Sequence, residues 1–483
     1  MNTYSDFLLM VPEAVLVAVL VVLFIADFAS SKQQERNWLN PLACVLMLPV
    51  IAAPLLQTGE VHTFGEMYRN TFGVGIVKAI LAAGTLIVFV QSKVWAQKSQ
   101  KEGEFYMLIV STLLGMFVML SAGHFLMFFL GLEMASVPMA TVVAFDKYRK
   151  DSAEAAAKYI LTATFSSGVM LYGISFLYAV CGTLYFDDVA QCVTGLFASS
   201  ATSHPLLLIL GFVFFFSGLG FKLSLVPFHF WTADTYQGAP TTVTGYLSVI
   251  SKGAAAYTLL IILFHVFGAM RAEWEYLMYI VIVLSITIAN LFAIRQGELK
   301  RFMAFSSISQ AGYIMLAAIG TDWNLSATAL LYYVLIYIVA NMSVFSIIAV
   351  VEQNNDGRTD IDDYDGFYQT NPKLAFLMTL ALFSLGGIPP FAGMFSKFFV
   401  FMAAAKAGSA WAYAIVFIAL INTVVSLYYY LLIVKAMYIK KTDTPLPTFK
   451  SDVNTKLALT LCTAGIALFG VCSCIFEWIA ANV

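Results

Sequence analysis

Long apolar runs separated by short polar loops recur along the whole chain. A membrane-spanning helix needs about 20 mostly apolar residues. Fourteen runs fit, which predicts an all-α polytopic membrane protein with spans near 6–29, 38–57, 73–93, 104–121, 124–145, 152–181, 205–227, 240–267, 275–295, 299–320, 325–351, 372–406, 411–438 and 455–480. The seventh and twelfth spans are predicted to be broken, because helix breakers occur near Val226–Pro227 and from Gly386 to Pro390.

The composition agrees with that pattern. The 483-residue chain is 60% hydrophobic and 11% charged, whereas soluble proteins carry about 25% charged residues. Together with a formal net charge of −2, this excludes a soluble enzyme, a disordered protein and a nucleic-acid-binding protein. The six cysteines form no CxxC pair, so we expect buried apolar side chains and no zinc or iron–sulfur site. Glu13 and the lack of a basic n-region favour a retained first helix over a signal peptide.

The loop charges predict the orientation. When the loops are numbered alternately, seventeen lysines and arginines lie in the odd set and three in the even set. Cytoplasmic loops carry the excess of basic residues. The odd loops, including Lys147–Lys150 and Lys440–Lys441, are therefore predicted to be cytoplasmic, and both termini to face the outside.

The remaining basic residues lie inside spans and are all lysines: Lys78, Lys158, Lys222, Lys252, Lys397 and Lys435. Lys78 and Lys435 lie near span ends, where a long side chain can reach water. Lys158 lies about two turns into its helix, at a depth between those of the span-end lysines and the deep ones. The other three are deep, and a charge at mid-bilayer costs at least about 2.5–3.5 kcal/mol. Such a cost indicates a functional reason.

A deep carboxylate offers these lysines a counter-ion. Glu133 lies about 13 Å into its span. A low dielectric favours neutral lysine and a nearby carboxylate favours charged lysine, so a buried lysine can exchange a proton when its neighbour changes charge. A row of such groups is a candidate proton relay, which His229 and His265 can join, although His265 is near an outer helix end. A structural ion pair is the alternative for Glu133.

The breaks coincide with two deep lysines, since Lys222 precedes the first break and Lys397 follows the second. Transporters place broken helices at ion sites, in corresponding positions of two repeats. Phe216–Gly220 is similar to Phe383–Gly387 at an offset of 167 residues. Five spans separate the two segments, so the pattern predicts inverted repeats of spans 4–8 and 9–13. The two lysines are not strict symmetry mates in this alignment.

The stretch 217–252 resembles the signature of the antiporter-like membrane subunits of respiratory complex I, most closely subunit N of the bacterial NADH-quinone oxidoreductase. Phe129–Glu133, Ala157–Leu161, Lys300–Tyr313 and Gly386–Lys397 support the resemblance, which covers essentially the whole chain. Two departures are Ala233, where proline is usual, and Gln310, where histidine is common; the resemblance assigns no role to Gln310.

The resemblance implies an N-terminal three-helix segment, two inverted five-helix units and a last helix, which we place at 1–102, 103–270, 271–440 and 441–483. It also implies a proton relay of the glutamate of helix five and the lysines of helices six, seven, eight and twelve, here Glu133, Lys158, Lys222, Lys252 and Lys397.

The implied function is proton translocation by a membrane subunit of an NADH-quinone oxidoreductase, driven by quinone reduction elsewhere in the complex. The chain itself would hold no cofactor or metal, because quinone, flavin and iron–sulfur clusters belong to other subunits. Its partners would be other membrane subunits in a bacterial inner membrane. There are two alternatives. One is a subunit of a multisubunit cation/proton antiporter or of a membrane-bound hydrogenase, with sodium as a possible ion. The other is a purely structural subunit.

Overall fold

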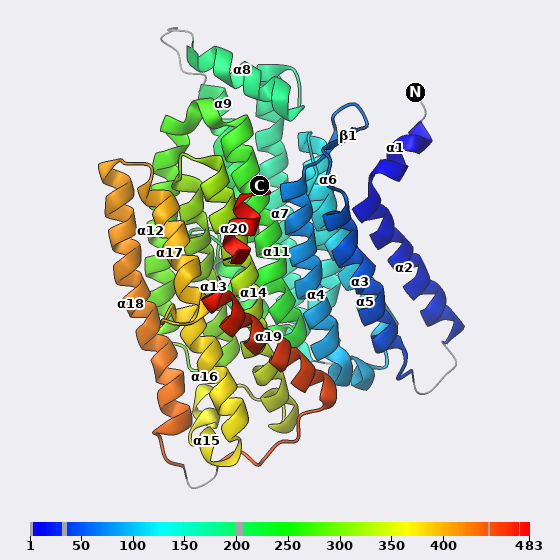
Figure 1. The fold of residues 1–483 in the computed structure, drawn as a ribbon, viewed down its shortest axis with the longest axis vertical. Helices are drawn as coiled ribbons and strands as arrows, with labels where there is room; N and C mark the ends of the chain where they lie inside the picture. Colours follow the sequence, from blue (N-terminus) through cyan, green and yellow to red (C-terminus); the bar gives the residue numbers. More distant parts are fainter. Residues whose placement is uncertain (1–2, 31–35, 148, 199–205, 443–444, 473) are drawn as a thin grey trace.

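The computed structural model describes residues 3–30, 36–147, 149–198, 206–442, 445–472 and 474–483, which form a bundle of long helices (Figure 1). In these ranges thirteen helical segments are long and apolar enough to cross a membrane. Their α-helices are α2 (Val11–Ala29), α3 (Leu39–Leu56), α4 (Phe72–Ser99), α5 (Glu102–Leu120), α6 (Phe125–Val143), α7 (Lys150–Cys181), α9 (Leu206–Leu223), α11 (Thr241–Ile261), α12 (Arg271–Ala293), α13 (Leu299–Met315), α14 (Trp323–Asn354), α18 (Ala410–Tyr438) and α19 (Val453–Val471). Short turns extend three of them: η1 (Ile262–Val266) follows α11, η2 (Gly268–Met270) precedes α12 and η3 (Leu316–Ile319) follows α13.

The fourteenth predicted span is a broken helix. It consists of α16 (Pro372–Gly386) and α17 (Ala392–Ala405), joined by residues 387–391. The seventh span is also interrupted, because α9 ends at Leu223 and the short α10 (Phe230–Gly238) follows. Proline has no backbone N–H to continue a helix, which explains both breaks. The predicted polytopic helical fold with broken helices seven and twelve is therefore confirmed.

Several small elements were not predicted. A hairpin of β1 (Val61–Thr63) and antiparallel β2 (Tyr68–Asn70) follows α3, and α8 (Phe186–Ala198) follows α7. Further short helices are α1 (Thr3–Leu9), η4 (Ile361–Tyr364), α15 (Phe367–Thr370) and α20 (Cys474–Ala480). The first and last predicted spans were thus too long. Pro12 in the first turn of α2 explains the first case, since proline favours a helix start over a helix interior.

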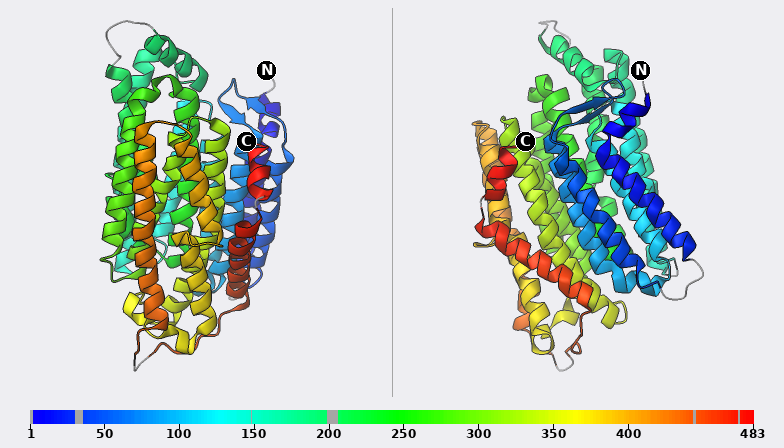
Figure 2. Two further views of the ribbon diagram at one scale, coloured as in Figure 1. Left: turned by 60° about the vertical axis from the view of Figure 1, so that its left-hand side comes forward. Right: turned by 45° about the vertical axis from the view of Figure 1, so that its right-hand side comes forward.

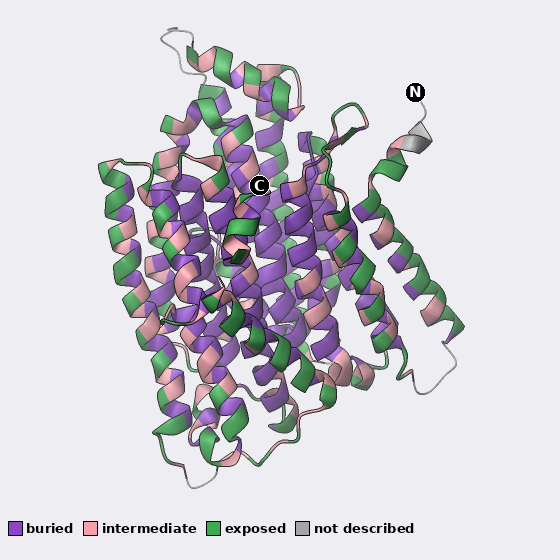
Figure 3. Ribbon diagram, viewed as in Figure 1, coloured by how far each residue is buried: buried purple, intermediate pink, exposed green. Residues whose placement is uncertain are grey.

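The two ends of the bundle differ in what they carry. Both ends of the chain lie toward the end that bears the hairpin and α8, and α15 lies at the opposite end (Figures 1 and 2). We call these the terminal end and the α15 end. Helices α11, α13 and α14 form the buried centre, whereas α2, α18 and α19 expose much of their surface (Figure 3). The centre is therefore screened from lipid by the surrounding helices.

At the terminal end, α8 is fastened to the bundle. A disulfide joins Cys181 at the end of α7 to Cys192 in α8. The expectation that all six cysteines are buried apolar residues was therefore wrong, because α8 brings two of them together; Cys474 is also exposed. Arg69 donates to both carboxylate oxygens of Asp187, at 2.7 and 2.5 Å, and lowers the pKa of that carboxyl.

Candidate functional site

Lys222 lies in the last turn of α9, directly before the break, and its side chain is buried. Its Nζ donates to Ser136 Oγ on α6 at 2.8 Å and to the Tyr159 hydroxyl on α7 at 3.1 Å. Both partners are uncharged. The break therefore presents an ammonium group to two hydroxyls instead of a carboxylate.

Lys252 lies in the middle of α11 and is 1% exposed. Its Nζ donates to Ser307 Oγ on α13 at 2.7 Å. The Tyr236 hydroxyl is 3.3 Å from the same serine oxygen, and the amine lies 5.6 Å from the Tyr236 ring centroid. Lys252 thus also has neutral partners.

Lys397 lies in the second turn of α17 and is 4% exposed. Its Nζ donates to the Gly386 carbonyl at 3.2 Å and lies 4.8 Å from the Tyr313 ring centroid. Gly386 is the last residue of α16, and the carbonyls at a helix C-terminus carry partial negative charge. The break in this span therefore supplies the oxygen that the lysine contacts.

Helix α13 connects two of these lysines. Ser307 binds Lys252, and Gln310 lines one small cavity with Lys397. The two α13 residues are three positions apart, so they share a face of the helix. Gln310 accepts from the Tyr333 hydroxyl and donates to Tyr430 at 3.3 Å. Hydroxyl and amide groups thus occupy the space between Lys252 and Lys397.

Between Lys222 and Lys252 lies α10. The Trp231 ring contacts Tyr159, the partner of Lys222, at 5.2 Å and Tyr236, near Lys252, at 6.4 Å between centroids. No chain of protein hydrogen bonds joins the two lysines within the described residues. We use the term central row for Lys222, Lys252 and Lys397 with the neutral groups that bind them.

Two predicted residues lie outside the central row. Glu133 is half-buried on α6 and makes no ion pair or hydrogen bond with the described residues, so the expected pairing with a lysine inside the chain is absent. Its helical neighbours Leu130 and Val137 are 59% and 54% exposed, which places Glu133 on the outer surface of the bundle. Lys158 is 44% exposed and pairs with Glu154 and Asp234, both at 2.7 Å.

The two predicted histidines are also peripheral. His229 is half-buried before α10 and stacks on Phe230, with 4.6 Å between ring centroids. His265 is exposed near the terminal end and contacts Trp323. Neither imidazole is hydrogen-bonded to a lysine in the part of the chain that the structure describes.

Lys78 differs from the expectation of a side chain that reaches water. It is completely buried, and its Nζ donates to Glu13 at 2.6 Å and to Asn70 at 2.8 Å. Tyr68 donates to the other Glu13 oxygen at 2.8 Å. The hairpin that supplies Asn70 and Tyr68 covers the pair, and the sequence pattern gave no sign of this cover.

Sequence reasoning missed the neutral partners of the lysines. They come from distant positions, and Ser136 is 86 residues from Lys222. One signal was present, because Ser306, Ser307, Ser309 and Gln310 fall within five residues of a predicted span. A second missed group is Glu352, 14% exposed at the end of α14, which accepts from Thr241 at 2.5 Å and lies 3.6 Å from Lys300.

Comparison with known proteins gives consistent matches. The family model of the transmembrane NADH:quinone oxidoreductase/Mrp antiporter family matches residues 122–456. NADH-quinone oxidoreductase subunit N of Phocaeicola vulgatus is 56% identical over 469 residues, 96% of each chain. The protein of the same name from Azobacteroides pseudotrichonymphae is 47% identical over 490 residues, 99% of this chain and 98% of its own.

Solved structures show the same fold. A chain of respiratory complex I from Thermus thermophilus with bound aureothin superposes with a TM-score of 0.81 at 28% identity, covering 98% of this chain and all of that one. A chain of the Mrp complex from Dietzia has a TM-score of 0.81 at 18% identity, covering 98% of this chain and 97% of its own, which shows the fold alone. The chain belongs to the subunit N family of NADH-quinone oxidoreductase, the antiporter-like membrane subunits of complex I.

Proposed function

We propose that this chain translocates protons through the central row, driven by quinone reduction elsewhere in its NADH-quinone oxidoreductase. The observation that carries the proposal is that Lys222, Lys252 and Lys397 are all buried and all bind neutral groups. A buried ammonium group without a counter-ion is poorly stabilised, so little is needed to make it release its proton. These lysines therefore suit a relay better than a permanent ion pair would.

The remaining polar groups support a hydrated path between the lysines. The buried Tyr337 hydroxyl, Ser309 Oγ and Asn341 Oδ1 have no hydrogen-bond partner among the described residues. Buried polar atoms are nearly always satisfied by protein or by ordered water. Water at these atoms would extend the row formed by Ser307 and Gln310, and protons would pass along α13 between Lys252 and Lys397.

The surroundings of Lys158 support its role as the entry point for protons. It lines a polar cavity of about 320 Å³ with Glu154, Asp234 and Arg301, and the cavity is open at the surface. Asp234 pairs with both cations, at 2.7 Å from each. Because this group is wet and charged, it can exchange protons with solvent. In our proposal it feeds Lys222, whose partner Tyr159 follows Lys158 directly in α7.

Glu133 supports coupling between subunits. An ionised carboxylate facing lipid at mid-span is costly. Glu133 has no partner among the described residues and lies on the outer surface of α6. We therefore propose that a neighbouring membrane subunit covers it, and that the charge of Glu133 transmits the state of that neighbour to Lys222 through Ser136, three residues further along α6.

We also propose that the terminal end faces the outside. The excess of basic residues in the odd loops favours this orientation. The Cys181–Cys192 disulfide at the terminal end supports it independently, because disulfides persist in oxidising compartments such as the bacterial periplasm.

The test is substitution of Lys222 and Lys397 in the assembled complex. Lys→Met at either site removes the titrating group and roughly keeps the volume, so the complex should assemble and quinone-coupled proton pumping should fall. Lys→Arg should not restore pumping, since guanidinium does not deprotonate in proteins. Lys435→Met is the matched control, because Lys435 is an exposed lysine of α18.

A structural role for the lysines gives the reverse result. Arginine would then restore pumping, and methionine would disrupt assembly. Full pumping by an assembled complex carrying both Lys222→Met and Lys397→Met would remove the two lysines from the mechanism.

A further inference from the structure

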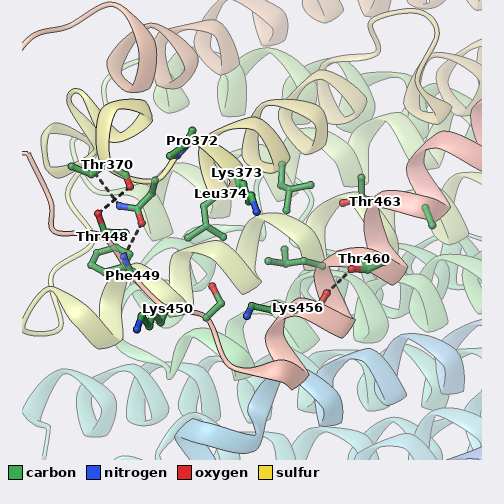
Figure 4. A pocket seen from close by; sticks show the side chains of 15 residues that line it. Thr370, Pro372, Lys373, Leu374, Thr448, Phe449, Lys450, Lys456, Thr460 and Thr463 are labelled. Atoms are coloured by element: carbon green, nitrogen blue, oxygen red, sulfur yellow. Dashed lines mark hydrogen bonds between the residues drawn. The ribbon is translucent and has the colours of Figure 1, made fainter.

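A groove opens at the α15 end of the bundle, between α16 and α19 (Figure 4). Its volume is about 910 Å³, in the upper part of the range of about 300–1,000 Å³ that ligand sites occupy. The start of α16, the first turns of α19 and the loop that precedes α19 form its walls. None of these residues belongs to the central row.

Three lysines from three segments surround this groove. Lys373 comes from the first turn of α16, Lys450 from the loop and Lys456 from the first turn of α19 (Figure 4). None of the three forms an ion pair with a described residue, and no carboxylate occurs among the described residues that line the groove. The mouth of the groove therefore carries unbalanced positive charge.

Residues 447–452, which include Lys450, are held in place at both ends. The buried Asn371 side chain donates to the Pro447 carbonyl at 3.0 Å and accepts from the Phe449 N–H at 2.8 Å. At the other end of the loop, Asp452 caps the N-terminus of α19. A fixed loop presents its lysine without the ordering cost that a mobile one would bring to binding.

The interior of the groove is apolar. Leu374, Leu377 and Leu459 line it within about one turn of Lys373 and Lys456 along the two helices. Thr463 lies seven residues beyond Lys456, about 10 Å further along α19. Its hydroxyl oxygen is buried without a hydrogen-bond partner in the described ranges. Along the two helices the groove thus changes from positive to apolar, and the Thr463 hydroxyl lies beyond the leucines.

We propose that the groove binds one anionic phospholipid. Its phosphate contacts Lys373, Lys450 and Lys456, and an acyl chain lies along the leucines toward Thr463. Basic pockets between membrane helices are known to hold anionic headgroups. The binding site itself depends on neither the proton relay nor the orientation of the chain; the orientation decides only which leaflet supplies the lipid.

The experiment uses the intact complex and two photoactivatable lipids, phosphatidylglycerol and zwitterionic phosphatidylcholine, each with the reactive group in an acyl chain. Wild type should be labelled by phosphatidylglycerol within 372–377 and 453–464. Each lysine near a charged headgroup contributes about a fivefold gain in affinity. Changing Lys373, Lys450 and Lys456 together to glutamine should therefore weaken binding about a hundredfold.

The control variant changes three other lysines on the same end, Lys98, Lys101 and Lys147, to glutamine. They line a separate cavity of about 560 Å³ that also contains Asp146. This variant loses the same formal charge and should label the groove like wild type. Both variants are first checked for a full set of partner subunits, so that labelling is compared only between assembled complexes.

Three results would overturn the proposal. One is equal labelling by phosphatidylcholine and phosphatidylglycerol in wild type. Another is unchanged phosphatidylglycerol labelling in the assembled groove variant. The third is an assembled wild-type complex in which neither lipid labels the groove, which would mean that a partner subunit covers it.

Discussion

Among single residues, the partner of a buried lysine indicates its role better than its depth does. Lys78 and Lys252 are both almost completely buried. Lys78 has a carboxylate 2.6 Å away, whereas the hydrogen-bond partner of Lys252 among the described residues is a serine hydroxyl at 2.7 Å. The first arrangement pairs the amine with a counter-ion, and the second, in our proposal, leaves it free to exchange a proton. Lys78 is therefore structural in our interpretation, although in the sequence both residues are simply lysines within apolar spans.

This contrast predicts different outcomes for two glutamates. Glu13→Ala leaves Lys78 buried without its counter-ion, and breaking such a pair costs about 3–5 kcal/mol of stability. Less complex should then assemble, while pumping per assembled complex changes little. Glu133→Ala should assemble and pump less. Complex yield and proton pumping per complex measure both effects, and equal residual pumping per complex would contradict the assignment.

A second prediction concerns Ser307, the hydrogen-bond partner of Lys252. Ser307→Ala removes a hydrogen bond to a charged group, worth about 1.5–3 kcal/mol. If the bond acts in the rate-limiting transfer, pumping slows by about tenfold to a hundredfold. Thr258→Ala on α11 is the matched control, because among the described residues its buried hydroxyl bonds only to the Ala254 carbonyl of its own helix. Equal rates in the two variants would argue against Ser307.

At the level of elements, the broken span depends on very close packing between its two halves. A Cβ at Gly393, near the start of α17, would lie 1.6 Å from the Ser384 carbonyl oxygen of α16. Only glycine permits this approach. The contact sets the position of Lys397, one turn further along α17, against Gly386. The break is thus a compact joint rather than a loose loop.

Gly393→Ala should therefore separate α16 from α17. We expect a lower thermal stability of the complex and lower pumping, because Lys397 loses its contact with the Gly386 carbonyl. Gly168→Ala on α7 is the control, since a Cβ there has no atom within 4 Å. Wild-type stability and pumping in an assembled Gly393→Ala complex would show that the joint tolerates the extra methyl group.

For the whole molecule, the sequence predicted the spans and both breaks because lipid imposes strict rules on them. Every backbone polar group in the bilayer must be satisfied, so helices must be long, apolar and interrupted only inside protein. The sequence also indicated which lysines are deep. It did not predict the partners Ser136, Tyr159 and Ser307, because side chains far apart in sequence meet only through helix packing. The hairpin and α8 lie at the terminal end of the bundle, where the rules for apolar spans do not apply, so they were not predicted.

The proposed orientation predicts how the two ends react with an impermeant thiol reagent. In a background without free cysteines, Glu60→Cys beside the hairpin should be labelled in intact cells, because Glu60 is 73% exposed at the terminal end. Asp362→Cys, at a position 89% exposed at the α15 end, should react only after the membrane is opened. The opposite labelling pattern would show that the chain has the inverted orientation, which would place the phospholipid groove in the other leaflet.

The burial of every α13 residue except Arg301 has a consequence for how the chain is made. This helix carries Ser306, Ser307, Ser309 and Gln310 and has no surface suited to lipid. When ribosomes deliver it to the membrane, α11 and α12 are already present, but α17 and α18 are not. Tyr430 of α18, which contacts Ser306, is made more than one hundred residues later. We therefore expect the insertion machinery to shelter α13 until α18 arrives, so that this half of the bundle is completed only late in synthesis.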